Sequence, residues 1–302
     1  MRRPLPALLA ALLVGALGCD SAVEIELPEE EPRLVLSALF EADSLLTLDL
    51  RQSASALDEP SIEDVADATV EVFEDGAPVG TATYAEFRLR YVTDVRPRPG
   101  RTYRVRVSAP GFGPVEAEDA VPEPVPFEVV SVERGPEPTG GRDREDVVTV
   151  RFTDPPGDDH YALYGLATWS YPGRDYEQTF PLGYRSASPA LADGGLDGLL
   201  GETEAPRYVR ALFRDTPFEG ETVTIKLEVR RQDASEYGGE VEITERLRLA
   251  RVSETYYRYV RAIEADGGAG PFGDRTRTPS NVEGGYGIFA GFTATERALP
   301  QD

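Results

Sequence analysis

Short runs in which apolar residues occupy every second position are the dominant pattern of this chain of 302 residues. In the clearest run, Val223, Ile225, Leu227 and Val229 alternate with polar residues, which is the period of a strand with one buried face. The 29 Gly and 25 Pro residues break helices and favour turns. Alternating runs separated by frequent turn residues predict a mainly β protein.

The first residues of the chain predict export and a membrane anchor. Two arginines precede an apolar run from Leu5 to Leu17, and Gly18 comes directly before Cys19. The run has the length of a secretory signal and is shorter than the about 20 apolar residues that span a bilayer. We expect residues 1–18 to be a lipoprotein signal peptide and Cys19 to carry the lipid. A secreted protein cut nearby and an uncleaved anchor are the alternatives.

The cysteine content agrees with a lipid anchor. Cys19 is the single cysteine, so an exported form of the chain has no partner for an internal disulfide. Residues 19–32 are rich in acids and end at Pro32. Because like charges repel and extend a linker, we interpret this segment as an acidic tether.

The charge balance excludes some classes of partner. The chain has 31 Lys and Arg against 54 Asp and Glu, a net charge of −23. Nucleic acids and anionic lipid head groups attract basic surfaces, so neither is expected to bind. Lys226 is the single lysine. An acidic, lysine-poor surface fits a saline habitat, and a codon bias that replaces Lys by Arg explains it equally well.

Residues 33–121 predict an immunoglobulin-like β-sandwich. Asp75-Gly76 is a turn signal between two short strands. Pro99-Gly100 precedes a strand in which Tyr103, Val105 and Val107 alternate with polar residues. This pattern resembles the strand of such sandwiches in which a tyrosine caps a corner by bonding to the backbone.

Residues 127–302 predict a larger β-rich domain with one helix near residues 253–265. A proline-rich stretch at residues 122–126 precedes it and is expected to be a stiff linker. Ser253 is a candidate N-cap of the helix. Apolar residues at helical spacing share one face of that helix, which we expect to pack across a sheet or to close one end of it. These residues are Tyr256, Tyr259, Val260 and Ile263.

The residue types available for catalysis are few. His160 is the single histidine and lies among acids, where a surface imidazole is expected, and Cys19 is assigned to the membrane. A Ser–His or Cys–His pair needs a base beside its nucleophile, and zinc needs three or four ligands of these kinds. We therefore predict no enzyme, no catalytic residues and no cofactor. A pair of carboxylates for glycoside hydrolysis cannot be located by sequence among so many acids.

Asp154, Asp158 and Asp159 surround a Pro-Pro-Gly turn. Carboxylate oxygens are ligands that calcium prefers, although the spacing is not that of an EF-hand loop. Asp side chains also hold turns by bonding to nearby backbone. The three aspartates are thus candidates either for a structural calcium site or for a hydrogen-bonded turn.

Aromatic residues gather between Tyr161 and Tyr184. If exposed, the rings of Trp169, Tyr171 and Tyr176 would form a stacking surface for a sugar or a partner protein. If buried, they would pack in the core or across strands, as aromatic residues in sheets often do. The aromatic residues of this stretch are Tyr161, Tyr164, Trp169, Tyr171, Tyr176 and Tyr184.

The order of these features resembles a lipoprotein family of Bacteroidota and their relatives, catalogued as domain of unknown function 4249. The motifs that carry the resemblance are Gly18-Cys19 with the acidic tether, Arg33-Leu34-Val35-Leu36, Pro99-Gly100-Arg101-Thr102-Tyr103, Phe152-Thr153-Asp154-Pro155-Pro156-Gly157, the helix with Tyr256 and Tyr257, Gly270-Pro271-Phe272, Pro279-Ser280-Asn281 and Gly284-Gly285-Tyr286-Gly287-Ile288-Phe289. The resemblance covers nearly the whole mature chain. It implies a β-rich lipoprotein of the outer membrane without assigned catalytic residues, and an accessory role beside TonB-dependent transporters.

Three functions follow as hypotheses. The first is a non-catalytic lipoprotein, on the periplasmic or cell-surface side of the outer membrane, that binds a partner such as a transporter barrel and helps it to capture or gate a ligand. The second is a lipoprotein that binds a glycan or another ligand through the aromatic region from Tyr161 to Tyr184. The third is an enzyme, which detectable turnover by the purified protein would establish.

Overall fold

A computed structural model describes residues 31–53, 63–136, 144–194, 207–232, 241–268 and 278–300. The chain divides into two units between Glu31 and Pro32, and all but one of the described residues belong to the second unit, Pro32–Asp302. Cys19 and nearly all of the acidic tether lie outside the described residues, so lipidation stays a prediction.

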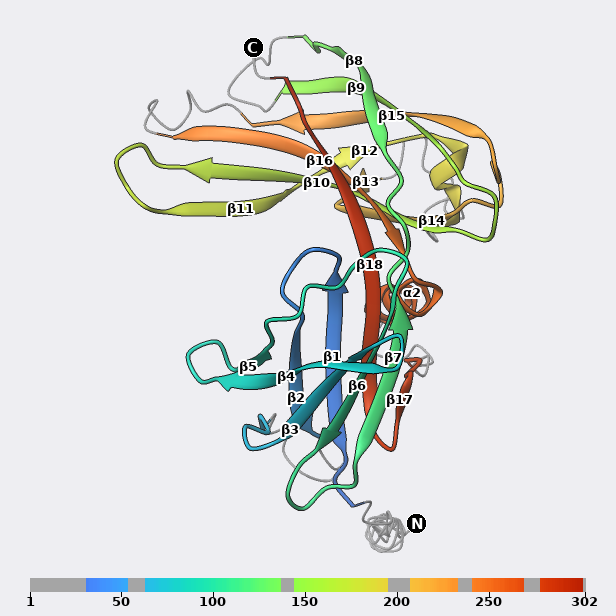
Figure 1. Cartoon of the computed structure of the whole chain (residues 1–302). Coiled ribbons are helices and arrows are strands. Elements are labelled where there is room, and N and C mark those ends of the chain that lie inside the picture. The colour runs from blue at the N-terminus through green and yellow to red at the C-terminus, as the bar shows by residue number, and fades with distance from the viewer. Residues whose placement is uncertain are drawn as a thin grey trace, which may run out of the picture. The chain divides into compact units, whose positions relative to one another are not determined.

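The N-terminal part of the second unit is built from seven strands (Figure 1). They are β1 (Leu34–Glu41), β2 (Thr47–Gln52), β3 (Thr69–Glu74), β4 (Ala77–Ala85), β5 (Arg90–Val92), β6 (Thr102–Ser108) and β7 (Val115–Ala120). Burial alternates along β1, β3 and β6, because successive side chains of a strand point to opposite faces.

The turn between β3 and β4 is formed as the sequence predicts. Asp75 and Gly76 have φ angles of 48° and 82°, and Glu74 pairs with Ala77 across the turn. Two consecutive residues with positive φ match the twist of a two-residue hairpin, which explains the preference for Asp-Gly at this place.

Tyr103 of β6 caps a corner, as predicted. Its side chain is completely buried, and its hydroxyl accepts a hydrogen bond from the backbone amide of Arg98 at 2.9 Å. The same hydroxyl donates to Glu74 Oε2 at 2.5 Å. The turn at Pro99-Gly100 is therefore tied to both β6 and β3.

The rest of the chain adds eleven strands, a short 3₁₀ helix and one α-helix. These elements are β8 (Phe127–Glu133), β9 (Arg144–Thr153), β10 (His160–Ser170), β11 (Glu177–Leu182), β12 (Tyr184–Arg185), η1 (Pro189–Gly194), β13 (Arg207–Tyr208), β14 (Arg210–Arg214), β15 (Thr222–Arg231), β16 (Glu242–Val252), α2 (Glu254–Gly268), β17 (Val282–Glu283) and β18 (Tyr286–Ala298). The predicted mainly β fold is confirmed.

Strand β18 joins the two parts of the chain into one hydrogen-bonded sheet. Its first half pairs in parallel with β1 and its second half pairs antiparallel with β16, as Figure 1 shows in dark red. The resulting 13-stranded sheet runs in the order β11-β10-β16-β18-β1-β2-β5-β4-β3-β6-β7-β17, with β14 also paired to β10. The strands β1 and β16 lie on either side of the predicted linker at residues 122–126 in the sequence. Backbone hydrogen bonds of β18 connect both of them in one sheet.

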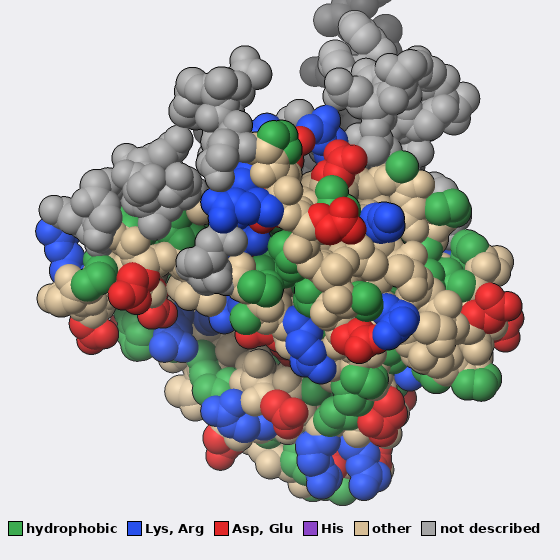
Figure 2. All heavy atoms as spheres, turned by 90° about the horizontal axis from the view of Figure 1, so that it is seen from above, with side chains coloured by type: hydrophobic (Ala, Val, Ile, Leu, Met, Phe, Trp, Pro, Cys, Tyr) green, Lys and Arg blue, Asp and Glu red, His purple; other side chains and the backbone are tan. Residues whose placement is uncertain are grey.

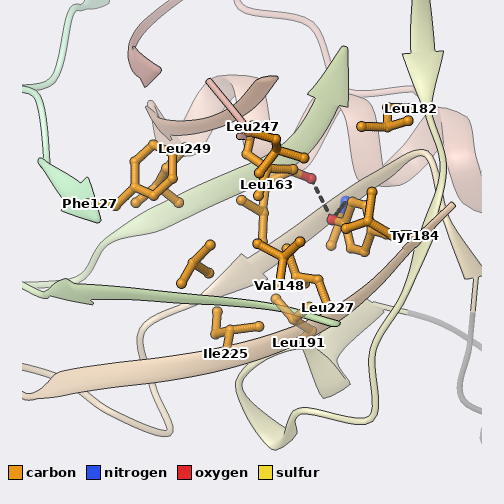
Figure 3. Packing of buried hydrophobic residues seen from close by; sticks show 14 of the residues in the cluster. Phe127, Val148, Leu163, Leu182, Tyr184, Leu191, Ile225, Leu227, Leu247 and Leu249 are labelled. Carbon is orange, nitrogen blue, oxygen red and sulfur yellow. Dashed lines mark hydrogen bonds between the residues drawn. The ribbon is translucent and has the colours of Figure 1, made fainter. Parts of the chain in front are cut away.

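Two large cores lie on either side of this junction. The N-terminal core is completed by Val282 and Phe289 from the last strands. In the other core, the five-stranded sheet β13-β12-β15-β9-β8 contributes residues such as Val148 and Ile225. These side chains pack against Leu163 and Leu247 of β10 and β16, with the Tyr184 hydroxyl bonded to the Leu163 carbonyl at 2.7 Å (Figure 3).

Helix α2 packs across the large sheet, against β18 and β10. The Ser253 hydroxyl accepts the Tyr256 amide at 3.1 Å, which confirms the predicted N-cap. Tyr256, Tyr257 and Val260 are buried in the contact. Ile263 is 46% exposed, so its predicted place on the packed face is wrong, because Tyr257 fills the face instead.

Ion pairs across strands occupy many of the arginines. Arg104 of β6 pairs with Glu116 of β7 at 3.1 Å, and Arg151 of β9 with Glu128 of β8. Figure 2 shows basic and acidic side chains interspersed on the face seen from above.

Among the described residues, no helix is long and apolar enough to cross a membrane.

Candidate functional site

A polar cavity of about 710 Å³ lies where the ends of several strands meet. Its wall comes from the end of β7 and the residues after it, the turn before β10, the end of β14, the end of β16 and the start of α2. Cavities of this size hold small molecules. We call this space the cavity and take it as the candidate site.

Three aspartates meet beside the cavity and form what we call the acidic cluster: Asp154, Asp159 and Asp215. One carboxylate oxygen of each lies within 4.8 Å of the others, and the three side chains are buried. Asp159 and Asp215 also line the cavity. Each aspartate comes directly before or after a strand, so the cluster forms where β9, β10 and β14 end.

Strand pairing brings Asp159 and Asp215 together. Strands β10 and β14 are antiparallel with His160 opposite Arg214, so the residue before β10 meets the residue after β14. The Asp159 amide donates to Asp215 Oδ2 at 2.7 Å, and the Asp215 amide donates to the Asp159 carbonyl at 3.1 Å. The two carboxylates are therefore fixed by backbone geometry.

Asp154 is held from a different side. Its Oδ1 accepts a hydrogen bond from the Tyr161 hydroxyl, and its Oδ2 accepts the Gly220 amide at 2.8 Å. Arg251 of β16 pairs with Asp159, with Nε 2.7 Å from Oδ1. The acidic cluster is thus connected to four strands and to the turn at Gly220.

Burial shifts the protonation equilibria of this region. It raises the pKa of Asp159, against the opposing hydrogen bond from Arg251, and it raises the pKa of Asp215. Both shifts have the direction expected when a carboxylate is removed from water near other acids. Burial, with the neighbouring Arg214 charge, lowers the pKa of His160, so its imidazole is neutral at neutral pH.

His160 is half-buried at the edge of the cavity, and not the freely exposed imidazole that the sequence predicts. Its ring lies 4.7 Å from the Tyr257 ring, and the guanidinium carbon of Arg214 lies 5.0 Å from the centre of the same tyrosine ring. Packing on Tyr257 therefore fixes the position of the histidine.

Another part of the cavity wall is fixed by Asp119, near the end of β7. One of its oxygens accepts the Thr255 hydroxyl at 3.2 Å, and the other accepts the Gly291 amide at 2.8 Å. Burial raises the pKa of Asp119. This carboxylate connects β7 with α2 and β18.

The comparison with protein families finds a match over most of the chain. The family described as a domain of unknown function (DUF4249) matches residues 20–298, which is nearly the whole chain. The chain belongs to the DUF4249 family. A search of curated proteins finds no match to it.

In this DUF4249 protein the predicted calcium candidates separate. Asp154 and Asp159 lie together, but Asp158 is exposed and is not a member of the acidic cluster. Asp215 takes the third position. Asp154 accepts hydrogen bonds from the Gly220 amide, 66 positions away, and from the Tyr161 hydroxyl; these are tertiary contacts and not the bonds to nearby backbone that hold an Asp turn.

The predicted aromatic candidates lie on the hairpin of β10 and β11, away from the residues that line the cavity. Trp169 and Tyr171 are partly buried against the core, and Trp169 donates to Gln232 at 2.5 Å. Tyr176 is 51% exposed and lies 5.8 Å from Tyr171, measured between ring centres. Of the three predicted residues, Tyr176 has the most accessible ring.

Sequence reasoning missed Asp215, Asp119 and Arg251 of the DUF4249 chain. Asp215 is 56 positions from Asp159, and Asp119 is 172 positions from Gly291. No sequence motif predicts contacts between residues that are so far apart in the chain. The only local signal is that each residue comes at or near the end of an alternating apolar run, where strand ends can gather side chains.

Proposed function

We propose that this protein is an exported lipoprotein, held at the outer membrane by lipid on Cys19, which binds a ligand without catalysing a reaction. The observation that carries the proposal is the cavity of about 710 Å³, whose walls are fixed by Asp119 and by the pairing of β10 with β14. A preformed cavity with several converging polar side chains suits the capture of a small molecule.

The hydroxyl groups of the cavity wall support a binding role. Ser253 Oγ caps α2 by accepting the Tyr256 amide, and Thr255 Oγ1 donates to Asp119. Within the described residues, His160 is not among the hydrogen-bond partners of either hydroxyl. Nucleophilic catalysis needs a base within hydrogen-bond reach of the nucleophile, so these hydroxyls serve to hold the wall in place.

The partner in this proposal is a TonB-dependent transporter barrel of the same membrane, as the family resemblance implies. A lipid anchor keeps the cavity beside the membrane that contains the barrel, and the protein then helps the barrel to capture or gate its ligand. Several acyl chains, at about 0.8 kcal/mol for each buried CH₂, make such an anchor stable.

The test is a pull-down of the full-length protein from its own membranes in mild detergent, with bound proteins identified by mass spectrometry. The expected result is a transporter barrel in near-stoichiometric amount that stays bound at high salt. The Cys19→Ser variant is the matched control and is expected to leave the membrane fraction. Recovery of the wild-type protein alone, or a Cys19→Ser variant that stays in the membrane, contradicts the proposal.

A second candidate function is glycan binding on the hairpin of β10 and β11. The observation that favours it is the exposed Tyr176 ring beside Tyr171 in the turn between β10 and β11. Phe180 of β11 is also 37% exposed. Aromatic rings on a surface stack against sugar faces. The strand β11 that carries Phe180 is the last strand of its sheet, so a ligand can approach it from the side.

Alanine variants on a glycan array separate the two functions. We expect Tyr176→Ala, and the double variant Trp169→Ala and Tyr171→Ala, to lose glycan binding and to retain the transporter barrel. Phe87→Ala removes another exposed ring, 85% accessible and outside the hairpin, and is expected to retain both. Glycan binding that survives all of these substitutions rejects the second candidate.

A further inference from the structure

The acidic cluster carries more negative charge than its protein neighbours balance. Asp154, Asp159 and Asp215 are 2%, 6% and 3% exposed. Arg251 forms an ion pair with Asp159, and no ion pair of Asp154 or Asp215 occurs within the described residues. Three carboxylates and one guanidinium leave an excess of two negative charges in a buried place, which is unfavourable without a further positive charge.

One oxygen of the acidic cluster also lacks a partner. Asp159 Oδ2 is buried and has no hydrogen bond within the described residues, although Oδ1 of the same side chain binds Arg251. A buried acceptor without a partner is rare in folded proteins, because its lost hydration is not replaced. This oxygen is therefore free to bind a ligand.

The geometry of the three carboxylates fits a single calcium ion. Calcium binds oxygens at about 2.3–2.6 Å, so two oxygens on one ion are separated by at most about 5 Å. One carboxylate oxygen of each aspartate lies within 4.8 Å of the other two. The donors are all oxygens, which a hard cation prefers, and the cavity lined by Asp159 and Asp215 gives the ion a path of entry.

We propose that Asp154, Asp159 and Asp215 bind one calcium ion. The ion balances the two excess charges, and the unpartnered oxygen of Asp159 is one of its ligands. It also connects the turn between β9 and β10 to the end of β14, and so fixes one wall of the cavity. This inference is independent of the proposed transporter partner.

The test compares the full-length protein in calcium and in EDTA at neutral pH. Equilibrium dialysis is expected to find one calcium ion bound per chain. Thermal unfolding is expected to show a Tm higher by about 5–10 °C when calcium is about 100-fold above its Kd. Magnesium, which keeps more of its water and needs a tighter geometry, is expected to give a smaller rise.

Two substitutions locate the ion. Asp215→Asn removes one charged ligand, and we expect the calcium Kd to rise by about tenfold or more, because the affinity of calcium sites depends on the number of carboxylates. Asp158→Asn removes an acid from the same turn that is exposed and outside the cluster, and it is expected to leave the Kd unchanged.

The outcomes against the proposal are distinct. Absence of bound calcium at millimolar concentration, with the same Tm in calcium and in EDTA, overturns it. So does a calcium Kd that rises with Asp158→Asn and not with Asp215→Asn, because the ion then lies elsewhere. If Asp215→Asn does not fold, the dialysis and the Tm comparison of the wild-type protein decide the question by themselves.

Discussion

Asp119 accepts a hydrogen bond from the backbone amide of Gly291 at 2.8 Å, although 172 positions separate the two residues. Asp119 is the second-last residue of β7, and Gly291 lies in the middle of β18 where this strand passes from β1 to β16. The second oxygen of Asp119 binds Thr255 of α2. One half-buried carboxylate therefore joins three elements at the wall of the cavity.

Asp119→Ala is expected to destabilise the protein by about 1–3 kcal/mol, because the buried Gly291 amide loses its partner. The neighbouring Glu118 has a side chain that is 56% exposed, so Glu118→Ala is the control, with an expected effect within about 0.5 kcal/mol. Urea unfolding followed by circular dichroism measures both. Equal effects of the two substitutions would show that the link from Asp119 to Gly291 does not contribute to stability.

The lowered pKa of Asp146 leads us to expect that the stability of the protein depends on pH. This buried residue of β9 binds Arg144 at 2.7 Å and Arg231 at 3.0 Å, and Arg231 also pairs with Glu245 of β16. Burial alone would raise the pKa of Asp146, but the hydrogen bonds from Arg144 and from the Gly135 amide, with the charges of both arginines, lower it overall.

A lowered pKa means that the folded protein holds the charged form of Asp146 more strongly than the unfolded chain does. The resulting stability is fully present above the ordinary aspartate pKa of about 4 and is lost as the pH falls through the lower folded value. Asp146→Asn is expected to lose about 3 kcal/mol at pH 7, because it breaks a buried ion pair.

Urea unfolding at a series of pH values checks this prediction. The difference in the free energy of unfolding between the wild-type protein and Asp146→Asn should shrink as the pH falls below about 4. Glu128→Gln removes an exposed ion pair with Arg151 and should cost less than about 1 kcal/mol. A difference for Asp146→Asn that stays constant down to acid pH is the result that contradicts the assignment.

Tyr103→Phe tests the capped corner. The substitution keeps the buried ring and removes the hydroxyl that binds the Arg98 amide and Glu74, so a loss of about 1–3 kcal/mol is expected. Tyr84→Phe removes a hydroxyl for which no hydrogen bond occurs within the described residues, and it should change stability by less than about 0.5 kcal/mol. Thermal unfolding of both variants makes the comparison, and a neutral Tyr103→Phe would rule out a stabilising role for the corner.

Gly287→Ala tests the close approach of β18 to β1. Gly287 has a φ of 114°, and a Cβ atom there would lie 1.9 Å from the Leu36 carbonyl oxygen. We expect a loss of about 4 kcal/mol or more, or failure to fold, because backbone atoms cannot move aside cheaply.

Gly111→Ala separates backbone strain from this clash. Gly111 also has a positive φ, 81°, but a Cβ atom there meets nothing within 4 Å. Its expected cost is about 1–2 kcal/mol, due to the left-handed backbone alone. Similar Tm values for the two variants would mean that the contact of Gly287 with Leu36 is not a constraint on the fold.

Local features of the fold could be predicted from the sequence. The Asp75-Gly76 turn, the Tyr103 corner and the Ser253 cap each depend on residues within five positions of one another or on the φ preference of one residue type. The apolar spacing also predicts helix α2, although Ile263 is exposed and lies outside its buried face. Such features are decided by interactions that neighbouring residues make in any context.

The candidate site could be predicted only in part. Asp154 and Asp159 share a turn and are therefore visible in the sequence as a pair, whereas only the pairing of β10 with β14 brings Asp215 to Asp159. The exposure of the aromatic rings also could not be predicted from the sequence. Tyr161 and Tyr184 are buried and Tyr176 is exposed, a difference that the clustering of aromatic residues in the sequence does not predict.

The sequence by itself determined that the chain is mainly β, where its turns, its corner tyrosine and its helix lie, and that its N-terminus has the pattern of a lipoprotein signal. Only the tertiary structure decided that β18 completes both parts of the sheet and that the three aspartates of the acidic cluster meet. The physical reason is that alternation and turn chemistry act over a few residues, whereas strand order and buried charge depend on which distant segments pair.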